Sequence, residues 1–348
     1  MMKIESIELF KVDRPLESPF RIAVATRDKY EGVLVKVVTD DGLVGWGESA
    51  PSYRLTRETT ASVIEELTRV KSSLIGKDPC DITHILANLD LSPAALTGVE
   101  TALWDITAQS LGTPLYRVFG STRKEFDTSI TIGIKSLDEV AHHAEKLVNE
   151  GVSIIKLKIG VNPEEDIERV KLVRSIAANA RIRVDGNLGY TVDEAIRVAR
   201  GIEKYDIEFF EEPVAGLGNL KKLRKSIGIK VMADESVKTL NEAITAIREK
   251  AVDYVNLKLQ KMGGITRTRI ICDVLADAGI PCMIGGFSET LIAMTVAAHL
   301  KVAHPNIEFA DLDAHIGIVD PPVVGGFTLK GSHAILPDTP GLGAKGSP

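Results

Sequence analysis

From about residue 128 onward, the chain repeats one pattern: a short apolar stretch, a turn, and a longer segment whose apolar residues recur every three or four positions. The short stretches predict β-strands, and the longer segments predict amphipathic α-helices. Strand starts lie roughly 22–28 residues apart, which leaves room for one crossover helix each. Eight strands are predicted, at residues 128–134, 154–159, 181–185, 207–210, 231–234, 253–258, 281–285 and 308–311.

Start and stop signals support the helices between these strands. Ser136 can cap a helix that ends at Gly151, and Asn162-Pro163 begins the next helix with proline at its first position. Eight alternating β/α units predict an α/β fold, and within that class a TIM-type barrel rather than a doubly wound sheet.

The two ends of the chain do not follow this repeat. Residues 1–125 predict an α+β module that precedes a barrel of residues 126–320. Residues 321–348 are rich in glycine and proline and are predicted to pack on the N-terminal module. The elements predicted in these two parts are strands at 3–12, 32–39, 43–47 and 326–330, a hairpin turn at Asp40-Asp41-Gly42, and helices near 56–75 and 96–111.

The composition is that of an ordinary globular protein, with 44% hydrophobic and 26% charged residues among 348. A net charge of −6 without a basic tract gives no reason to expect nucleic-acid binding. Three scattered cysteines predict neither a disulfide framework nor a zinc site. No stretch approaches the ~18 apolar residues of a membrane span, and the first residues lack an apolar signal core, so we expect a cytoplasmic protein. The sequence also permits a homo-oligomer.

Lysines stand at the ends of two predicted strands on opposite sides of the barrel. Lys156 and Lys158 end the second strand and point to the same side, because side chains alternate along a strand; Lys258 ends the sixth strand. Surface lysines on an edge strand are the simple alternative, but a closed barrel has no edge. We therefore expect these lysines at the barrel mouth, where barrel enzymes carry out their chemistry. Lys261 lies beyond the strand and is expected in a loop or in solvent.

Asp185, Glu211 and Asp234 end the third, fourth and fifth predicted strands. An aspartate after a strand often caps the next helix, so each residue alone has a structural alternative. Three carboxylates on neighbouring strand ends would repel each other strongly without a cation. Oxygen ligands without thiol or imidazole indicate magnesium, with manganese as a substitute. A cation flanked by lysines is suited to removing a proton next to a carboxylate.

A further acidic pair, Asp311 and Asp313, ends the eighth strand. Such a pair can form a turn, or it can accept hydrogen bonds from a cationic group of a substrate.

These residues carry a resemblance to the enolase superfamily, muconate-lactonizing subgroup, over the whole chain. The resemblance implies a modified, enolase-like barrel with a capping domain built from residues 1–125 and 321–348. A lysine base that works with magnesium is a known pattern of this superfamily. The matching segments are Lys156-Leu157-Lys158, Val184-Asp185-Gly186-Asn187, Phe210-Glu211-Glu212-Pro213, Ala233-Asp234-Glu235-Ser236, Asn256-Leu257-Lys258 and Ala102-Leu103-Trp104-Asp105.

Asp311-Leu312-Asp313 resembles the Asp-x-Asp motif with which dipeptide epimerases of this subgroup hold the substrate's α-ammonium group. The resemblance thus implies an isomerase, a magnesium-dependent dipeptide epimerase, whose partner is a small-molecule dipeptide. An o-succinylbenzoate synthase, an N-acylamino acid racemase and a muconate-type cycloisomerase stay open as alternatives, and none of them has a free substrate amine to hold.

One position departs from the Ala-Glu epimerases, in which an arginine five residues after the Pro-Phe of the capping loop binds the substrate's glutamate side chain. That place is Ala25 here, and Arg21, Arg27 and Lys29 are out of register with it. The sequence therefore does not predict Ala-Glu specificity. The capping loop, residues 18–30, is expected to cover the barrel mouth together with residues 49–57.

The resemblance also implies a mechanism. Lys158 or Lys258 removes the α-proton of the dipeptide's C-terminal residue, and the opposite lysine returns a proton to the other face of the enediolate. Asp185, Glu211 and Asp234 hold the cation, which is expected to lower the pKa of the basic lysine. Lys156 is expected to contribute positive charge beside the substrate, and Asn187 and Glu235 are expected to orient the ligands.

Overall fold

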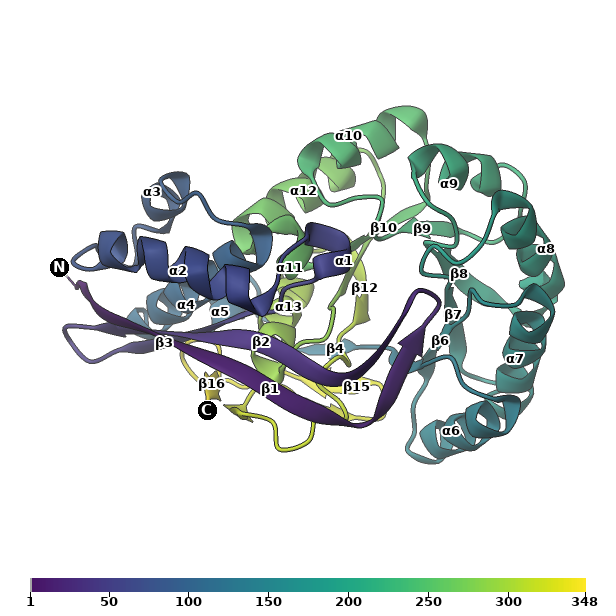
Figure 1. The fold of residues 1–348 in the computed structure, drawn as a ribbon, viewed down its shortest axis with the longest axis horizontal. Helices are drawn as coiled ribbons and strands as arrows, with labels where there is room; N and C mark the ends of the chain where they lie inside the picture. Colours follow the sequence, from purple (N-terminus) through teal and green to yellow (C-terminus); the bar gives the residue numbers. More distant parts are fainter. Residues whose placement is uncertain (1) are drawn as a thin grey trace.

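The computed structural model describes residues 2–348. The predicted barrel is confirmed: eight parallel strands lie side by side in the order β12-β11-β10-β9-β8-β7-β6-β5 (Figure 1). Consecutive strands are neighbours, as expected when each pair is joined by one crossover connection. The strands are β5 (Ile130–Ile132), β6 (Ile154–Lys158), β7 (Arg181–Asp185), β8 (Ile207–Glu211), β9 (Val231–Ala233), β10 (Tyr254–Leu257), β11 (Cys282–Gly285) and β12 (Ile307–Asp311).

The last strand meets the segment before the first without a regular ladder. Ser129 N donates to Ala310 O at 3.2 Å, and Leu312 N donates to Thr128 Oγ1 at 2.7 Å. These bonds bring the two ends of the sheet together and complete the barrel wall.

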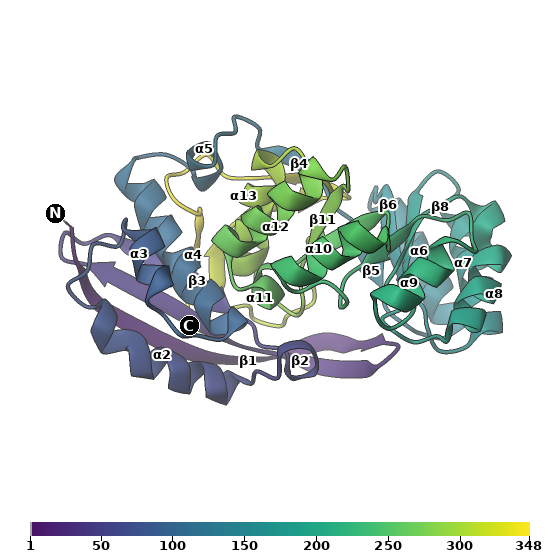
Figure 2. The same ribbon diagram turned by 90° about the horizontal axis from the view of Figure 1, so that it is seen from above.

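Helices pack outside the barrel between successive strands (Figures 1 and 2). Ser136 caps α6 in a capping box with Glu139, and Asn162 caps α7, whose first residue is Pro163. Both predicted helix starts are therefore confirmed. The helices are α6 (Leu137–Asn149), α7 (Pro163–Ile176), α8 (Val192–Ile202), the 3-10 turn η1 (Glu203–Tyr205), α9 (Leu217–Arg224), α10 (Leu240–Glu249), α11 (Leu259–Met262), α12 (Ile265–Asp277) and α13 (Leu291–Ala303).

The N-terminal module contains a long antiparallel hairpin of β1 (Ile4–Ile22) and β2 (Ala25–Thr39), to which β3 (Val44–Ser49) adds a third strand. The expected loop at residues 18–30 is instead the end of this hairpin, because pairing resumes at Phe20 and Arg27 and continues to the turn. The hairpin extends from the module to the barrel (Figures 1 and 2). The helices of the module are α1 (Tyr53–Thr56), α2 (Thr60–Leu74), α3 (Ile82–Ala87), α4 (Pro93–Ser110) and α5 (Leu115–Val118).

The C-terminal residues contact both parts of the chain. β13 (Val323–Gly325) pairs with β16 (Ala344–Gly346), while β14 (Thr328–Lys330) and β15 (His333–Ile335) form a small sheet with β4 (Glu125–Asp127). Leu342 N donates to Asp105 Oδ1 of α4 at 2.7 Å. The tail is thus fastened to the N-terminal module as well as to the start of the barrel. The division of the chain at residues 125 and 320 stays a prediction.

Residues two apart along the strands share the inside of the barrel, and this alternation builds two layers. The inner layer closes the barrel floor with large side chains, among which the Arg183 guanidinium lies over the rings of Phe209 and Phe309 at 5.2 and 5.3 Å. Met232 and Met283 belong to the same packed group. Two residues further along the strands, the side chains become carboxylates and lysines. The packed floor therefore places the charged layer at the C-terminal mouth.

Candidate active site

The structure brings the predicted strand-end residues together in one buried layer. Strand register places Lys158 beside Asp185, and Asp185 beside Glu211. Asp185 and Glu211 are completely buried, and Lys158 and Lys258 are 8% and 6% exposed. Charged groups this deeply buried need partners of opposite sign, and the layer supplies them.

Lys156 lies at the centre of the carboxylates. Its Nζ is 3.1 Å from Asp185 Oδ2, 2.7 Å from Glu211 Oε2 and 2.7 Å from Asp311 Oδ2. Burial alone would lower the pKa of Lys156, but the charges of Asp311, Glu211 and Asp185 outweigh it and hold the pKa well above its ordinary value. Lys156 is therefore a fixed positive charge in this arrangement. A lysine that is held in its protonated form is unsuited to act as a base.

Lys158 and Lys258 approach the layer from opposite walls, because β6 and β10 are four strands apart in the barrel order. Lys158 Nζ lies 2.6 Å from Asp185 Oδ2, and Lys258 Nζ lies 2.7 Å from Asp234 Oδ2. Burial would lower the pKa of Lys258, but the Asp234 carboxylate raises it above its ordinary value. Without a cation beside the carboxylates, Lys258 is therefore protonated, and a basic form requires that Asp234 be engaged elsewhere.

The three expected cation ligands each have a lysine within ion-pair distance. Burial raises the pKa of Glu211 to about 7, reinforced by the Asp185 charge. Burial acts in the same direction on Asp185, but Lys158 and Lys156 outweigh it and hold the pKa of Asp185 below its ordinary value. Among residues 2–348, no three histidine, cysteine or acidic side chains are already arranged to surround a metal ion. Ammonium groups lie beside the carboxylates instead, so the residues converge but do not form a finished cage.

The donor set nevertheless fits a hard divalent cation. It offers carboxylate oxygens from three neighbouring strand ends, and thiol and imidazole groups are not part of it. Glu211 Oε1 accepts a hydrogen bond from Asn256 Nδ2 at 2.7 Å, and the buried Glu211 Oε2 has the Lys156 ammonium group 2.7 Å away without hydrogen-bond geometry. A buried carboxylate oxygen that is compensated by charge but accepts no directed hydrogen bond keeps lone pairs that a divalent cation could use.

Asn187 and Glu235 form the rim of this layer. Asn187 Nδ2 donates to Glu235 Oε1 at 3.3 Å, and the backbone N–H of Asn187 donates to Asp185 Oδ1 at 3.0 Å. Arg54 of α1 also donates to Glu235 Oε1, at 3.0 Å. The second oxygen of Glu235 and the amide oxygen of Asn187 are buried without a hydrogen-bond partner. Both residues line the pocket, so these acceptors are available to a bound group.

The expectation for Lys261 was wrong, because its side chain is buried rather than in solvent. The short helix α11 turns the chain back after β10, and Lys261 Nζ reaches Asp234 Oδ1 at 2.8 Å. Glu212 is a second residue whose position the sequence did not reveal: its Oε2 accepts from the backbone N–H of Asp234 at 2.5 Å. The i+3 spacing from Lys258 is the only signal in the sequence that could have indicated Lys261.

Asp311 and Asp313 lie on the same side of the mouth but have different partners. Asp311 pairs with Lys156 and accepts from Ser129 Oγ at 2.7 Å. Burial would raise the pKa of Asp311, but Lys156 lowers it to about 2. Among residues 2–348, Asp313 Oδ2 accepts a hydrogen bond from Thr131 N alone, at 2.6 Å, and burial together with the Asp311 charge raises the pKa of Asp313 to about 6. Asp313 is thus the acceptor with spare capacity.

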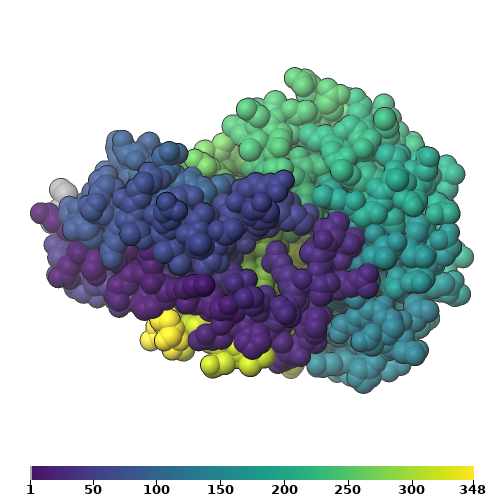
Figure 3. Space-filling view, in the orientation of Figure 1, coloured from purple at the N-terminus to yellow at the C-terminus, as the bar shows by residue number. Residues whose placement is uncertain are grey.

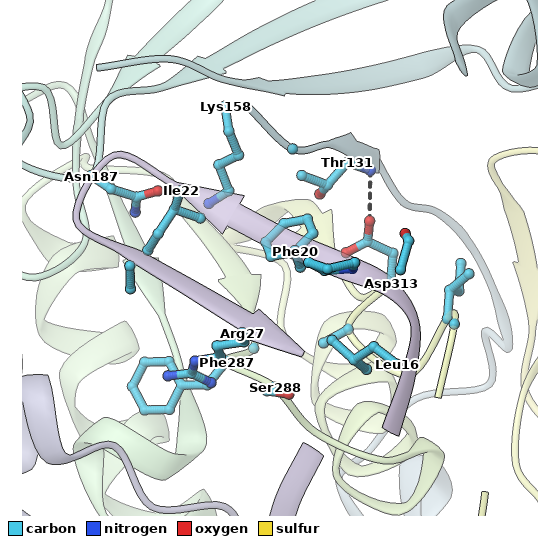
Figure 4. A pocket seen from close by; sticks show the side chains of 18 of the residues that line it. Leu16, Phe20, Ile22, Arg27, Thr131, Lys158, Asn187, Phe287, Ser288 and Asp313 are labelled. Atoms are coloured by element: carbon cyan, nitrogen blue, oxygen red, sulfur yellow. Dashed lines mark hydrogen bonds between the residues drawn. The ribbon is translucent and has the colours of Figure 1, made fainter. Parts of the chain in front are cut away.

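A cavity of about 780 Å³ opens above this layer. Figure 4 shows Lys158 and Asn187 on one side, Asp313 with Thr131 on another, and Arg27, Phe287 and Ser288 opposite Lys158. The hairpin contributes Phe20, Ile22 and Arg27 to the wall. In the space-filling view, the hairpin and the α1 region flank a hollow through which barrel atoms are visible (Figure 3). The cavity can hold a small organic molecule between the lysines.

Comparison with known proteins agrees with this geometry. Residues 4–120 match the mandelate racemase/muconate lactonizing enzyme N-terminal domain, and residues 139–347 match the enolase C-terminal domain-like family. The hydrophobic dipeptide epimerase of Enterococcus faecalis is 34% identical over 351 residues, which cover 98% of this chain and 99% of the relative.

Solved structures agree over the full length. The substrate-liganded L-Ala-D/L-Glu epimerase from Bacillus subtilis has a TM-score of 0.95 at 34% identity, covering 99% of both chains. The dipeptide epimerase from E. faecalis, complexed with Mg and the dipeptide L-Leu-L-Tyr, gives the same TM-score, identity and coverage. The chain therefore belongs to the mandelate racemase/muconate lactonizing enzyme family of the enolase superfamily.

Proposed function

We propose that this protein is a magnesium-dependent dipeptide epimerase, an isomerase that inverts the α-carbon of the C-terminal residue by 1,1-proton transfer. The observation that carries the proposal is the pair Lys158 and Lys258, which enter one cavity from opposite barrel walls. A proton can then leave one face of a carbon and be replaced on the other. The relatives support the proposal, since the two solved structures described above are those of an L-Ala-D/L-Glu epimerase and of a dipeptide epimerase complexed with Mg and a dipeptide.

Asp185, Glu211 and Asp234 are the residues that would hold the cation. When bound, it supplies Lewis-acid stabilisation of negative charge on the substrate's carboxylate. Carboxylates that held a cation would no longer pair with Lys158 Nζ and Lys258 Nζ, and either lysine could then take the α-proton. Lys156 retains its positive charge beside the reacting centre because Asp311 still pairs with it. The lysine that removes the α-proton and the lysine that returns a proton to the other face are therefore both already in place.

Asp311 and Asp313, which we call the amine site, distinguish dipeptide epimerisation from the alternative reactions of this fold. Asp311 and Asp313 lie at the cavity wall, and Asp313 has acceptor capacity that the protein itself does not use. A dipeptide's α-ammonium group supplies the donors, and hydrogen bonds to charged groups are the stronger kind. N-acylamino acids, o-succinylbenzoate precursors and muconates lack this group and leave the pair unused.

The side-chain preference follows from Arg27. The hairpin pairing puts Arg27 into the cavity wall two residues after Ala25, on the same face of β2. Burial, with the nearby Arg54, lowers the pKa of Arg27, and the guanidinium has no ion pair with any carboxylate among residues 2–348. An unpaired guanidinium in a cavity favours an anionic group. We therefore infer a preference for a dipeptide with an acidic side chain, in spite of Ala25.

The function is tested by proton exchange in heavy water with Lys158→Ala and Lys258→Ala, using Lys301→Ala on α13 as the control. Both active-site variants should lose epimerisation, because either direction needs one lysine as base and the other as acid. Each should lose at least ~10²–10⁴ in rate on its disabled side. Each variant should still exchange the α-proton of the epimer that faces its remaining lysine, with retention of configuration.

The two variants should therefore prefer opposite epimers. If both exchange the same epimer, or if either still epimerises at the wild-type rate, the opposed pair is not the catalytic machinery. Faster turnover of N-acetylated than of free dipeptides would favour the N-acylamino acid racemase instead.

No helix among residues 2–348 has the length and apolar character to cross a membrane. The cytoplasmic location, the lack of a nucleic-acid partner and the permitted homo-oligomer stay predictions.

A further inference from the structure

Two lysines hold Asp234, and they differ in their access to the cavity. Lys258 Nζ lies 2.7 Å from Asp234 Oδ2, and Lys261 Nζ lies 2.8 Å from Oδ1. Lys258 lines the cavity, whereas Lys261 is 2% exposed and is not part of the cavity wall. The two carboxylate oxygens are therefore divided between the cavity side and the protein interior.

Lys261 uses all of its donors within the protein. Besides Asp234 Oδ1, its Nζ donates to the backbone oxygen of Asp234 at 2.6 Å and to that of Asn256 at 2.7 Å. An ammonium group has three N–H donors, so none is left for a substrate. The acceptors belong to the ends of β9 and β10, which are neighbours in the sheet. Lys261 thus ties two strand ends to one oxygen of one carboxylate.

Stability alone does not account for a lysine at this position. Replacing a buried ion pair with well-packed apolar residues is often neutral or stabilising, so a buried lysine is weak evidence of a purely structural role. The three bonds do have one geometric effect: the two bonds to backbone oxygens fix the position of Lys261 Nζ, and the third then holds Asp234 Oδ1 and opposes rotation of the carboxylate. A carboxylate that cannot rotate always presents the same oxygen to the cavity.

We propose that Lys261 is a positioning residue that fixes Asp234 Oδ1, so that Oδ2 is the oxygen offered to the magnesium ion. The proposal rests on the proposed function only in taking Asp234 as a cation ligand. The helix α11 accounts for the spacing: its single turn brings residues 258 and 261 to opposite sides of one carboxylate. Lys258 can give up Asp234 when a cation arrives, while Lys261 keeps its hold.

Charge and orientation lead to opposite expectations for the loss of Lys261. If Lys261 acts only through its charge, removing it makes the site more anionic, and magnesium should bind more tightly. If it positions Asp234, removing it frees the carboxylate and should weaken binding about 10–100-fold, as is typical for partners that orient metal ligands. Lys258 provides a matched comparison, because its nitrogen lies at nearly the same distance from the same carboxylate.

The experiment titrates Mg²⁺ alone into the full-length protein by calorimetry, without dipeptide, for the wild type, Lys258→Met and Lys261→Met. Lys258→Met should leave the Kd for Mg²⁺ unchanged or lower it, and Lys261→Met should raise it about 10–100-fold. Lys301→Met, which removes a lysine bond to the backbone oxygen of Ile307, controls for loss of a lysine elsewhere in the barrel. If Lys261→Met fails to fold, Lys261→Ala, which also removes both the charge and the donors to Asp234, takes its place.

Tighter binding in the Lys261 variant, or a change of less than about two-fold, would overturn the positioning role. A wild-type protein that binds no Mg²⁺ would instead remove the cation site from the proposed function. A protein that binds Mg²⁺ with the expected pattern but does not epimerise dipeptides would leave the role of Lys261 intact. The outcomes of the two proposals are therefore separable.

Discussion

Four lysines occupy the charged layer, and their surroundings give them different properties. Lys156 faces three carboxylates and is held charged, and Lys261 has three acceptors and no access to the cavity. Lys158 and Lys258 each have one close carboxylate and line the cavity. A base must lose its proton and reach the substrate. Of the four lysines, only Lys158 and Lys258 have a single carboxylate partner to give up and also reach the cavity. Residue type alone could not have separated these roles.

The same comparison applies to the two aspartates of the amine site. Asp311 is already occupied by Lys156, so Asp313→Asn should remove the greater part of the attraction for a substrate ammonium. A hydrogen bond to a charged group contributes about 1.5–3 kcal/mol, which corresponds to a KM for free dipeptides roughly 10- to 150-fold higher. Asn keeps an acceptor for Thr131 N, so the fold should be unaffected.

Steady-state kinetics with free and N-acetylated dipeptides measure this effect. The wild type should prefer the free dipeptide, and Asp313→Asn should narrow the difference mainly through KM. An unchanged KM for free dipeptides in a folded variant would show that the ammonium group binds elsewhere.

At the scale of elements, the β1–β2 hairpin shows why strand ends and loops differ in predictability. Alternation along a strand and the common direction of parallel strands placed Asp185, Glu211 and Asp234 at one mouth from the sequence alone. The hairpin end could not be placed in this way, because its register depends on an irregularity between Pro15 and Phe20. A shift of this kind changes which hairpin residue faces the cavity. Counting from the Pro-Phe pair therefore led to Ala25 as the residue that faces the substrate. The strand pairing shows that Arg27, two residues later on the same face, also lines the cavity.

Replacement of Arg27 tests this element. Arg27→Ala should lower kcat/KM for L-Ala-L-Glu about 10- to 100-fold, because the acidic side chain loses a charge-assisted hydrogen bond. The same variant should change kcat/KM for L-Ala-L-Leu by less than about three-fold, since no anionic group is involved. Arg21→Ala is the control: Arg21 is exposed on the same hairpin and does not line the cavity. Equal losses for both dipeptides would mean that Arg27 shapes the cavity rather than binding an anion.

At the scale of the whole molecule, one buried histidine joins three parts of the chain. His299 of α13 accepts a hydrogen bond at Nδ1 from the Tyr116 N–H of α5, at 3.0 Å. Its Nε2 lies 2.9 Å from the carbonyl oxygen of Leu342 in the C-terminal tail, and because a carbonyl can only accept, Nε2 carries the proton. Neutral imidazole thus satisfies both contacts. A second proton would have to go on Nδ1, where it would break the bond from Tyr116.

This contact predicts a pH dependence of stability with a definite sign. Burial lowers the pKa of His299 from 6.5 to about 4, so the unfolded chain takes up a proton more readily than the folded one. The stabilisation is complete above pH 6.5 and is lost as the pH falls from 6.5 towards 4. A shift of this size corresponds to about 3 kcal/mol in total, of which about 2.5 kcal/mol is lost by pH 4.5.

His299→Gln isolates this effect, because glutamine is neutral at every pH and can still donate and accept. The free energy of unfolding is measured in urea at pH 7 and pH 4.5 for the wild type, for His299→Gln and for His142→Gln, an exposed histidine of α6. Other groups titrate in all three proteins, so the difference between wild type and variant carries the information. The wild type should be the more stable at pH 7, and its advantage over His299→Gln should shrink by about 2–3 kcal/mol at pH 4.5. His142→Gln should follow the wild type at both pH values. The difference in the free energy of unfolding between the wild type and His299→Gln could instead be the same at both pH values. In that case, a neutral imidazole would not be the group that links the barrel, the N-terminal module and the tail.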